Sequence, residues 1–330
     1  MPTKRAGAIA ALLVTALLLC AMPGLLARLN PGDGNRMDER LRPARLHTLT
    51  VWLMPDDLQD KRLLAALCTD YEKQTPGARV FLRSVSEDEW MQPQTVLPDV
   101  VLFGTGAIHQ PRSLLRPLTG LGDEEASAGC SGGVCYAAPL WLSPNVLVLP
   151  SDWAGEPSPT PLFGLDTPDE AAEEQTIPWD RVTAPGGLTL PEGVALQQLL
   201  LAAPAAVRQN LRSQSQGAAR VTQLCQLKDQ TGRALTPVLC DRVRYAGLCG
   251  DGQQGRDFLA FLLQNRNRAA ASGYLPYGLR LEGDSLPAAL SRTTPVIPNA
   301  FAHTRQELNA LCLDAFRRGQ DPVETMLRLQ

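Results

Sequence analysis

The sequence predicts an α/β fold for the part of the chain that follows residue 47. Strand-like and helical segments alternate there in the order strand, helix, strand, loop, strand, which is typical of a parallel sheet covered by helices. The third of these strands, 97–103 (LPDVVLF), is largely apolar, as are parallel strands that are buried on both faces. With 330 residues, of which 44% are apolar, the chain can build one large or two medium domains.

The first strand and the first helix are predicted from the spacing of their apolar residues. Residues 48–54 (TLTVWLM) place Leu49, Val51 and Leu53 on one face of a strand. A turn at QTPGARV leads from the following helix to a second strand over 78–85. The helix carries an apolar stripe at helical spacing, which consists of Leu63, Leu64, Leu67 and Tyr71.

One more strand and several helices are expected further along the chain. Residues 154–193 are rich in Pro, Gly and acidic residues and are predicted to be mostly loops. The last helix is predicted to begin after Asp321, because this capping residue is followed by Pro322 and by the acidic Glu324. The expected elements are a strand over 136–149 and helices over 194–211, 256–271, 305–318 and from 321 onward.

The N-terminus predicts that the chain is exported. Lys4 and Arg5 precede an uncharged apolar run over 6–27, which is long enough to cross a bilayer with its N-terminus in the cytoplasm. Cleavage of residues 1–27 as a signal peptide is one alternative, and lipidation at Cys20 is another. Each of these places the rest of the chain outside the cytoplasm, on a bacterial cell surface or in a periplasm. Residues 28–47 are expected to form a linker.

Composition argues against several functions. The net charge of −3 does not suit a nucleic-acid partner, because phosphate binding favours a basic surface. His47, His109 and His303 lie far apart in the sequence and lack the paired spacing of metal ligands. We therefore expect no nucleic acid, no metal and no other cofactor.

The cysteine spacing predicts short-range disulfides in an exported protein. Cys130 and Cys135 flank a short glycine-containing turn, so a disulfide between them is expected in an oxidising compartment. A second disulfide is predicted between Cys240 and Cys249. Two further cysteines, Cys68 and Cys312, lie on apolar helix faces and are predicted to be buried thiols.

Several segments resemble a known family when they are taken in order. They include LTVWLM, LPDVVLFGTGAI, YAAPLWLSPNVLVLPSDW, GRDFLAFLLQNRNRAAASGYLPYGL and ELNALCLDAFRRGQDPVETMLRL. Over about residues 48–330, their order and spacing are similar to those of the extracellular solute-binding proteins of ABC importers, the family that includes maltose-binding protein.

The resemblance implies a two-lobed, type II periplasmic-binding-protein fold with a hinge near 139–145 and a ligand cleft between the lobes. It assigns 48–143 and 251–281 to the first lobe and 144–250 and 282–330 to the second. Closure over a ligand is then read by an ABC permease. The chain is expected to act as a monomer and to convert no substrate.

A small polar ligand, most plausibly a carbohydrate, is expected in the cleft. Binding a sugar requires flat aromatic faces and side chains that hydrogen-bond hydroxyl groups. Ligands of parallel α/β sheets bind beyond the carboxyl ends of the strands. The residues that the resemblance and this rule place at the cleft are Trp52, Met54, Gly104, Thr105, Trp141, Ser143, Asn145, Tyr274 and Tyr277.

Two other functions are considered beside transport. The family usually has an aromatic-Asn pair after the crossing strand, and this chain has Leu149-Pro150 there. This departure motivates an alternative, a surface sensor or interaction module that has lost transport. The third function, an exported hydrolase, rests on Ser131 in a G-x-S-x-G sequence over 129–133. A nucleophile elbow requires a strand before the serine and a helix after it, whereas the strand-like stretch here comes after it.

A glycine-rich motif offers a weaker indication of nucleotide binding. Residues 250–255 match G-x-G-x-x-G between an apolar stretch and a helix. A dinucleotide site also needs a βαβ unit with an acidic residue about 20 positions further on. Residues 269–276 contain no acidic residue, so a loop that starts a helix is the favoured interpretation.

Overall fold

The computed structural model divides the chain into a unit over Met1–His47 and a unit over Thr48–Gln330. The helices and strands that it describes belong to the second unit, apart from the first residue of β1. The apolar run 6–27 and the rest of the predicted N-terminal segment up to residue 46 lie outside the described residues. No helix within the described residues is long and apolar enough to span a bilayer. Those residues are 47–54, 56, 58–86, 89–90, 96–120, 128–148, 179–185, 187–189, 219–227, 240–283, 286–291 and 297–328.

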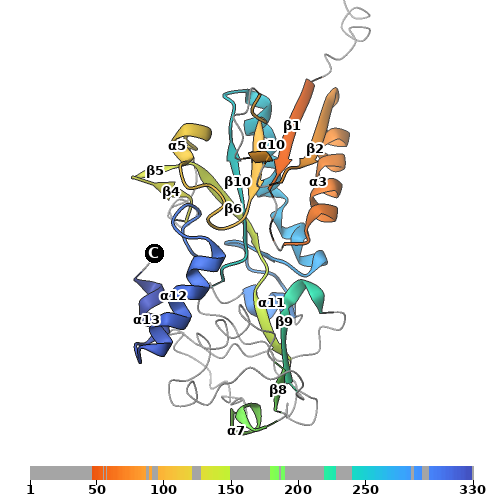
Figure 1. Cartoon of the computed structure of the whole chain (residues 1–330). Helices are drawn as coiled ribbons and strands as arrows, with labels where there is room; N and C mark the ends of the chain where they lie inside the picture. The colour runs from red at the N-terminus through yellow and green to blue at the C-terminus, as the bar shows by residue number, and fades with distance from the viewer. Residues whose placement is uncertain are drawn as a thin grey trace, which may run out of the picture. The chain divides into compact units, whose positions relative to one another are not determined.

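The main sheet has six strands, which are β1 His47–Leu53, β2 Ala78–Ser84, β3 Val100–Phe103, β6 Ala137–Leu142, β10 Val243–Leu248 and β11 Leu275–Pro276. Their spatial order is β11-β6-β10-β3-β1-β2 (Figure 1). Strands β1 and β3 run parallel, with Val51 opposite Val100, which confirms the expected parallel pairing. Strand β10 runs antiparallel to both of its neighbours, β3 and β6. The sheet is therefore mixed and not wholly parallel.

Two helices cover one face of this sheet. Helix α3 spans Lys61–Gln74 and helix α10 spans Gln253–Gln264. Tyr71 of α3 meets Phe258 and Phe261 of α10 in edge-to-face contacts, with ring centroids 5.0 and 5.2 Å apart. The apolar stripe of α3 predicted from the sequence is buried in this layer with Leu49, Val51 and Leu53.

The helix predicted over 256–271 is divided in the structure. Helix α10 ends at Gln264, and a 3-10 helix, η2, continues over Arg266–Ser272. The break falls at Asn265, whose side-chain Nδ2 donates to the Phe261 carbonyl. Because Asn hydrogen-bonds local backbone groups, it commonly ends a helix in this way.

The opposite face of the sheet is covered by shorter segments. Phe301 stacks on Phe103 of β3, which also stacks on Tyr245 of β10. The Tyr245 hydroxyl donates to the Pro298 carbonyl at 2.6 Å. The elements on this side are α5 Pro111–Leu114, β4 Cys130–Ser131, β5 Val134–Cys135 and α11 Leu286–Ser291.

A second, smaller sheet is formed by strands that lie between β6 and β10 in the sequence. Its strands are β7 Asn145–Val148, β8 Leu188–Thr189 and β9 Ala219–Gln223, in the order β7-β9-β8. The single strand predicted over 136–149 is thus two strands, β6 and β7, which belong to different sheets and are separated by Ser143-Pro144. Proline has no N–H for a ladder, so it marks a natural break in a strand.

The predicted lobe division differs from the structure at one strand. Residues 144–250 were assigned to the second lobe, and β7 to β9 form the second sheet. However, β10 lies inside the main sheet, between β6 and β3. The helix predicted over 194–211 lies outside the described residues.

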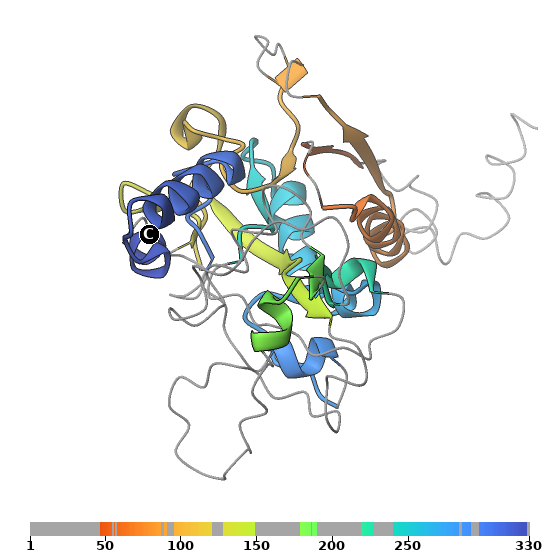
Figure 2. The same cartoon turned by 60° about the horizontal axis from the view of Figure 1, so that its bottom comes forward.

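The chain ends in two helices, α12 Arg305–Arg317 and α13 Pro322–Leu327, which lie against each other in Figure 2. Leu308, Cys312 and Met326 form their shared apolar core. The predicted cap of α13 is confirmed, because Asp321 Oδ1 accepts from the Val323 N–H at 2.8 Å. Helix α12 begins with a capping box, in which the Thr304 and Glu307 side chains each accept the other's backbone N–H.

Thr304→Ala is expected to lower the free energy of unfolding by about 1 kcal/mol, because it leaves the Glu307 N–H without its acceptor. Urea denaturation followed by circular dichroism measures the change. The matched control is Thr69→Ala in the exposed middle of α3, where Thr69 Oγ1 donates to the Ala65 carbonyl and no cap is lost. Equal stability of both variants and the parent chain would contradict the capping role.

Candidate functional site

The carboxyl ends of β1 and β3 meet at one edge of the main sheet. The Met54 N–H donates to the Leu102 carbonyl at 2.8 Å, so the chain leaves both strands at neighbouring points. A Cβ on Gly104 would lie 3.0 Å from Asp56 Oδ2. Glycine therefore leaves room for the Asp56 carboxylate, which lies against the loop after β3.

Asp56 belongs to a buried ion cluster around Arg244 of β10. Arg244 is fully buried, and its Nε and Nη2 donate to the two oxygens of Asp60 at 2.8 Å each. Its Nη2 also donates to Asp56 Oδ1 at 2.9 Å, and its Nη1 lies 2.5 Å from Asp56 Oδ2. The Trp141 indole Nε1 donates to Asp60 Oδ2 at 2.9 Å. This fork-like pairing holds the guanidinium in one plane with one carboxylate.

The position of Asp60 explains why a buried carboxylate is tolerated there. Asp60 is the residue before α3, and its carbonyl accepts from the Leu64 N–H. The positive end of the helix dipole favours a negative charge at such a position. Its side chain makes no cap bond and is instead directed at Arg244 and Trp141. One carboxylate thus ties the start of α3 to β6 and β10.

Burial and charge act in opposite directions on the groups of this cluster. Burial raises the pKa of Asp56, and the nearby Arg244 opposes that rise. Burial acts to lower the pKa of Arg244, but the carboxylates of Asp60 and Asp56 outweigh it, so that pKa is raised. The guanidinium therefore stays charged, and the cluster holds two acidic groups against one base.

A second set of buried polar residues joins the two connections between the sheets, which run from β6 to β7 and from β9 to β10. The Ser143 N–H, after β6, donates to the Arg242 carbonyl, before β10, at 2.9 Å. Arg242 Nη1 donates to Asn145 Oδ1 at 2.5 Å. The Thr105 hydroxyl donates to the Asp241 carbonyl at 2.9 Å. The loop after β3 and both connections are thus linked by buried hydrogen bonds, at the place where the resemblance expects a hinge.

The predicted tyrosines lie beside the same connections. The Tyr277 N–H donates to the Leu140 carbonyl of β6 at 3.0 Å. Burial raises the pKa of Tyr274, and the neighbouring Cys225 raises it further. The Ser143 hydroxyl donates to Cys225 Sγ at 3.3 Å. These contacts place Tyr274 next to the crossing from β6 to β7.

Trp52 lies apart from this group. Its ring meets Trp90 edge to face, with centroids 6.1 Å apart, and the Arg83 guanidinium lies 5.6 Å from its centroid. It borders an open groove of about 480 Å³. The other residues that line the groove are Thr50, Phe81, Leu82, Arg83, Val96 and Leu97.

The structure brings most of the predicted site residues together but buries all nine of them. Thr105, Ser143 and Asn145 share the hydrogen-bonded group at the connections, and Trp141 is wholly buried against Asp60. The predicted residues that are buried are Trp52, Met54, Gly104, Thr105, Trp141, Ser143, Asn145, Tyr274 and Tyr277.

The charged residues of the site were not found from the sequence. The detectable signal was the segment DRVRYAGL, which begins at Asp241 and brings two arginines into a stretch that is otherwise apolar. Charged side chains in a buried strand must be paired. The partners of Arg244, Asp56 and Asp60, lie more than 180 residues earlier, and no local pattern connects them.

The structure does not contain the second disulfide that the sequence predicts, and it supports neither the hydrolase motif at Ser131 nor the nucleotide-binding motif over 250–255. Cys240 and Cys249 form no disulfide, because they lie at opposite ends of β10, and six strand residues span about 20 Å. Burial raises the pKa of both thiols to about 12.

Ser131 lies in the two-stranded hairpin β4-β5, which lacks the strand-turn-helix of a nucleophile elbow. The motif over 250–255 follows β10, which is antiparallel to both neighbours and so forms no βαβ unit there.

Other cysteine predictions agree with the structure. Cys130 and Cys135 form a disulfide, and Cys68 and Cys312 are buried. Within the described parts of the chain, no three His, Cys, Asp or Glu side chains gather as a metal site would require.

The two sheets and the paired connections between them form the two-lobed α/β fold of periplasmic binding proteins. Among solved structures, the chain is similar to the galacto-N-biose/lacto-N-biose I-binding protein of an ABC transporter from Bifidobacterium longum, with a TM-score of 0.52 and 10% identity over 87% of this chain and 95% of that one. The chain thus has the fold of the solute-binding proteins of ABC importers, as predicted.

Two further solved structures show weaker similarity. An ABC substrate-binding protein from Listeria monocytogenes in complex with cycloalternan has a TM-score of 0.46 and 14% identity over 85% of this chain and 96% of that one. Iron-bound HitA from Pseudomonas aeruginosa has a TM-score of 0.45 and 14% identity over 79% and 96%. No family model and no curated protein matches the chain in sequence.

Arg244→Met is expected to lower the free energy of unfolding at pH 7 by about 3–5 kcal/mol, because it leaves two buried carboxylates without their base. A carboxyl whose pKa is higher in the folded than in the unfolded state destabilises the fold above that pKa and ceases to do so once protonated. The deficit should therefore shrink as the pH falls toward about 4, and urea denaturation at several pH values measures it.

Arg83→Met is the matched control for that experiment. Arg83 forms an ion pair with Glu89 at the surface, where its side chain is 56% exposed, and such pairs contribute at most about 1 kcal/mol. A deficit in Arg244→Met that is small, or that does not change with pH, would show that the cluster does not have this electrostatic role.

Proposed function

We propose that the chain is an extracytoplasmic solute-binding protein that captures a small polar ligand, most plausibly a carbohydrate, between its lobes and delivers it to an ABC permease. The observation that carries this proposal is the shared fold with a lacto-N-biose-binding protein of an ABC transporter. It is supported by the position of Asp56, Gly104 and Thr105 at the ends of β1 and β3, where ligands of α/β sheets bind.

The residues of the site have distinct roles in this proposal. The Asp56 carboxylate, held by Arg244, accepts hydrogen bonds from ligand hydroxyls, and the close approach at Gly104 keeps that carboxylate in the site. Lobe movement occurs at the connections on either side of Ser143 and Arg242, whose mutual hydrogen bond keeps them side by side. The other predicted site residues support this arrangement. They are Trp52 of β1, Met54 directly after β1, and Trp141, Ser143, Asn145, Tyr274 and Tyr277.

The proposal includes the cellular context. Residues 1–27 act as a signal peptide or membrane anchor, and residues 28–47 act as a linker. The Cys130–Cys135 disulfide supports an oxidising location outside the cytoplasm. A monomer that performs no chemical conversion suits a carrier that hands its ligand to a permease.

One observation favours the alternative, a surface sensor or interaction module without transport. Exposed apolar side chains gather at the groove beside Trp52, where Phe81 is 60% and Val96 is 74% exposed. Contiguous apolar surface of this kind often marks an interaction site. In this alternative, the buried ion cluster around Arg244 stabilises the fold and contacts no ligand.

A thermal-shift screen of the full chain tests the proposal against disaccharides, including lacto-N-biose and mannobiose, with peptides and polyamines as comparison ligands. A sugar that binds only the folded state raises the melting temperature as its concentration rises. Stabilisation by no sugar would contradict the carbohydrate proposal and would favour the interaction module.

Asp56→Asn is expected to weaken sugar binding by about tenfold to a hundredfold, because a charge-assisted hydrogen bond is replaced by a neutral one. Isothermal titration calorimetry measures the affinity. The matched control is Asp314→Asn, which breaks an exposed ion pair with Arg318 and should leave affinity unchanged. Equal affinity in the two variants would remove Asp56 from the site.

A further inference from the structure

The Cys130–Cys135 disulfide closes a very short hairpin. Strands β4 and β5 have two residues each, and Cys130 lies directly opposite Cys135. The turn between them is made by Gly132 and Gly133, whose φ values of 58° and 78° are left-handed and suit glycine. Because an isolated two-stranded hairpin is marginally stable, the disulfide is its principal internal restraint.

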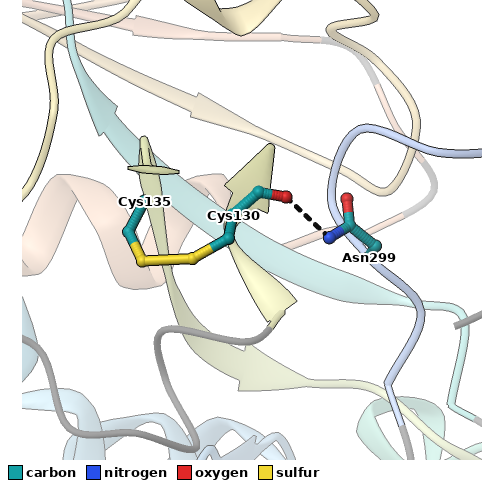
Figure 3. Close-up of a disulfide and its surroundings, with 3 residues drawn as sticks. All are labelled: Cys130, Cys135 and Asn299. Atoms are coloured by element: carbon teal, nitrogen blue, oxygen red, sulfur yellow. Dashed lines mark hydrogen bonds between the residues drawn. A yellow bond between two sulfur atoms is a disulfide. The ribbon is translucent and has the colours of Figure 1, made fainter. Parts of the chain in front are cut away.

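The hairpin and the residues just before it contact a segment that is distant in sequence. We call residues 297–304 the bracing segment. Asn299 Nδ2 donates to the Cys130 carbonyl at 2.8 Å (Figure 3). The Ala300 N–H donates to the Ala128 carbonyl at 2.8 Å, and Phe301 meets the Tyr136 ring edge to face. The bracing segment is thus held by the residues at and around the disulfide.

The bracing segment in turn holds the loop that follows β3. The Gly106 N–H donates to the Ala300 carbonyl at 2.9 Å. A Cβ on Gly106 would lie 2.4 Å from the His303 carbonyl oxygen and from Thr304 backbone atoms, so the two backbones are in close contact. Ala300 therefore links Ala128, two residues before Cys130, to Gly106 through its own N–H and carbonyl.

Other contacts keep the bracing segment on the sheet without the disulfide. Phe301 stacks on Phe103 with centroids 6.0 Å apart, and the Pro298 carbonyl accepts from the Tyr245 hydroxyl. Loss of the disulfide should therefore loosen the hairpin and the bracing segment locally, while the fold stays intact.

We propose that this disulfide is a redox-sensitive brace of the loop Gly104–Ala107. When it is oxidised, the hairpin holds the bracing segment and the loop in place; when it is reduced, both become more mobile and the affinity of the site falls. The mobility change stands on the contacts alone, whereas the effect on affinity rests on the proposed function. The reductant is a dithiol, which cleaves the S–S bond, leaves two cysteine thiols and is itself oxidised to a disulfide, so two electrons and two protons are transferred.

Three buried cysteines do not compete for this exchange. Cys130 and Cys135 are only partly buried, so a dithiol can reach them. Cys68, Cys240 and Cys249 are buried, and burial raises their thiol pKa to about 12. Thiolate is the attacking species in disulfide exchange, so these thiols do not reshuffle the bond near neutral pH.

Hydrogen exchange of the full chain, read by mass spectrometry with and without dithiothreitol, tests the brace. Reduction should speed exchange at Gly106 and Ala300 by about tenfold, while β2, which lies at the far edge of the main sheet, stays unchanged. The double variant Cys130→Ser/Cys135→Ser should match the reduced protein and show no response to dithiothreitol. Asn299→Ala, in the oxidised protein, should reproduce part of the change.

Several results would overturn the proposal. Faster exchange confined to 131–134, with Gly106 and Ala300 unchanged, would make the disulfide a staple of the hairpin only. Faster exchange throughout the chain would make it a global stabiliser. If the double variant does not fold, the dithiothreitol experiment on the folded parent chain still decides between these outcomes.

A sugar-binding arm separates this proposal from the proposed function. If a sugar binds, reduction should weaken it at least fivefold, and unchanged affinity would contradict the link between brace and site. If no sugar binds the oxidised chain, the proposed function fails, while the exchange measurements still support or overturn the brace.

Discussion

The buried pairing of Arg244 with Asp60 and Asp56 is the interaction on which the rest of the structure depends. It joins β10, the start of α3 and the end of β1, and through the Trp141 indole it also reaches β6. Charges in a low-dielectric interior are tolerated only when they are paired with good geometry. This requirement restricts the relative positions of four elements, since a shift of any one would leave a buried charge without its partner.

The same constraint shapes the candidate site. The end of β1 must bring Asp56 to Arg244, and Gly104 leaves room for its carboxylate. Directly before β10 and two residues before Arg244, the Arg242 carbonyl and side chain bind Ser143 and Asn145 of the other connection. In the proposed function, the ligand contact at Asp56 and the hinge at Ser143 and Arg242 would therefore lie at two polar groups that neighbouring residues of one segment, Arg242 and Arg244, hold in place.

Sequence reasoning found the scaffold of the site better than its charges. The parallel pairing of β1 with β3, the apolar face of α3 and the Asp321 cap follow from spacing and local residue type, and the structure contains all three. Trp141 is expected at the cleft, whereas the acceptor of its indole N–H, Asp60, is distant in sequence and was not foreseen. The prediction of a Cys240–Cys249 disulfide ignored the strand between them.

The sequence by itself determined the local elements and the short-range closures, because periods of 2 and 3.6 residues, caps and a five-residue cysteine spacing are set by neighbours in the chain. It also indicated the order of segments that resembles the solute-binding family. Only the tertiary structure decided that β10 enters the main sheet antiparallel to β3 and β6, and that Arg244 meets acids 184 and 188 residues away. Such pairings depend on which buried charges can be satisfied when all the elements pack at once, and no local stretch of sequence carries that information.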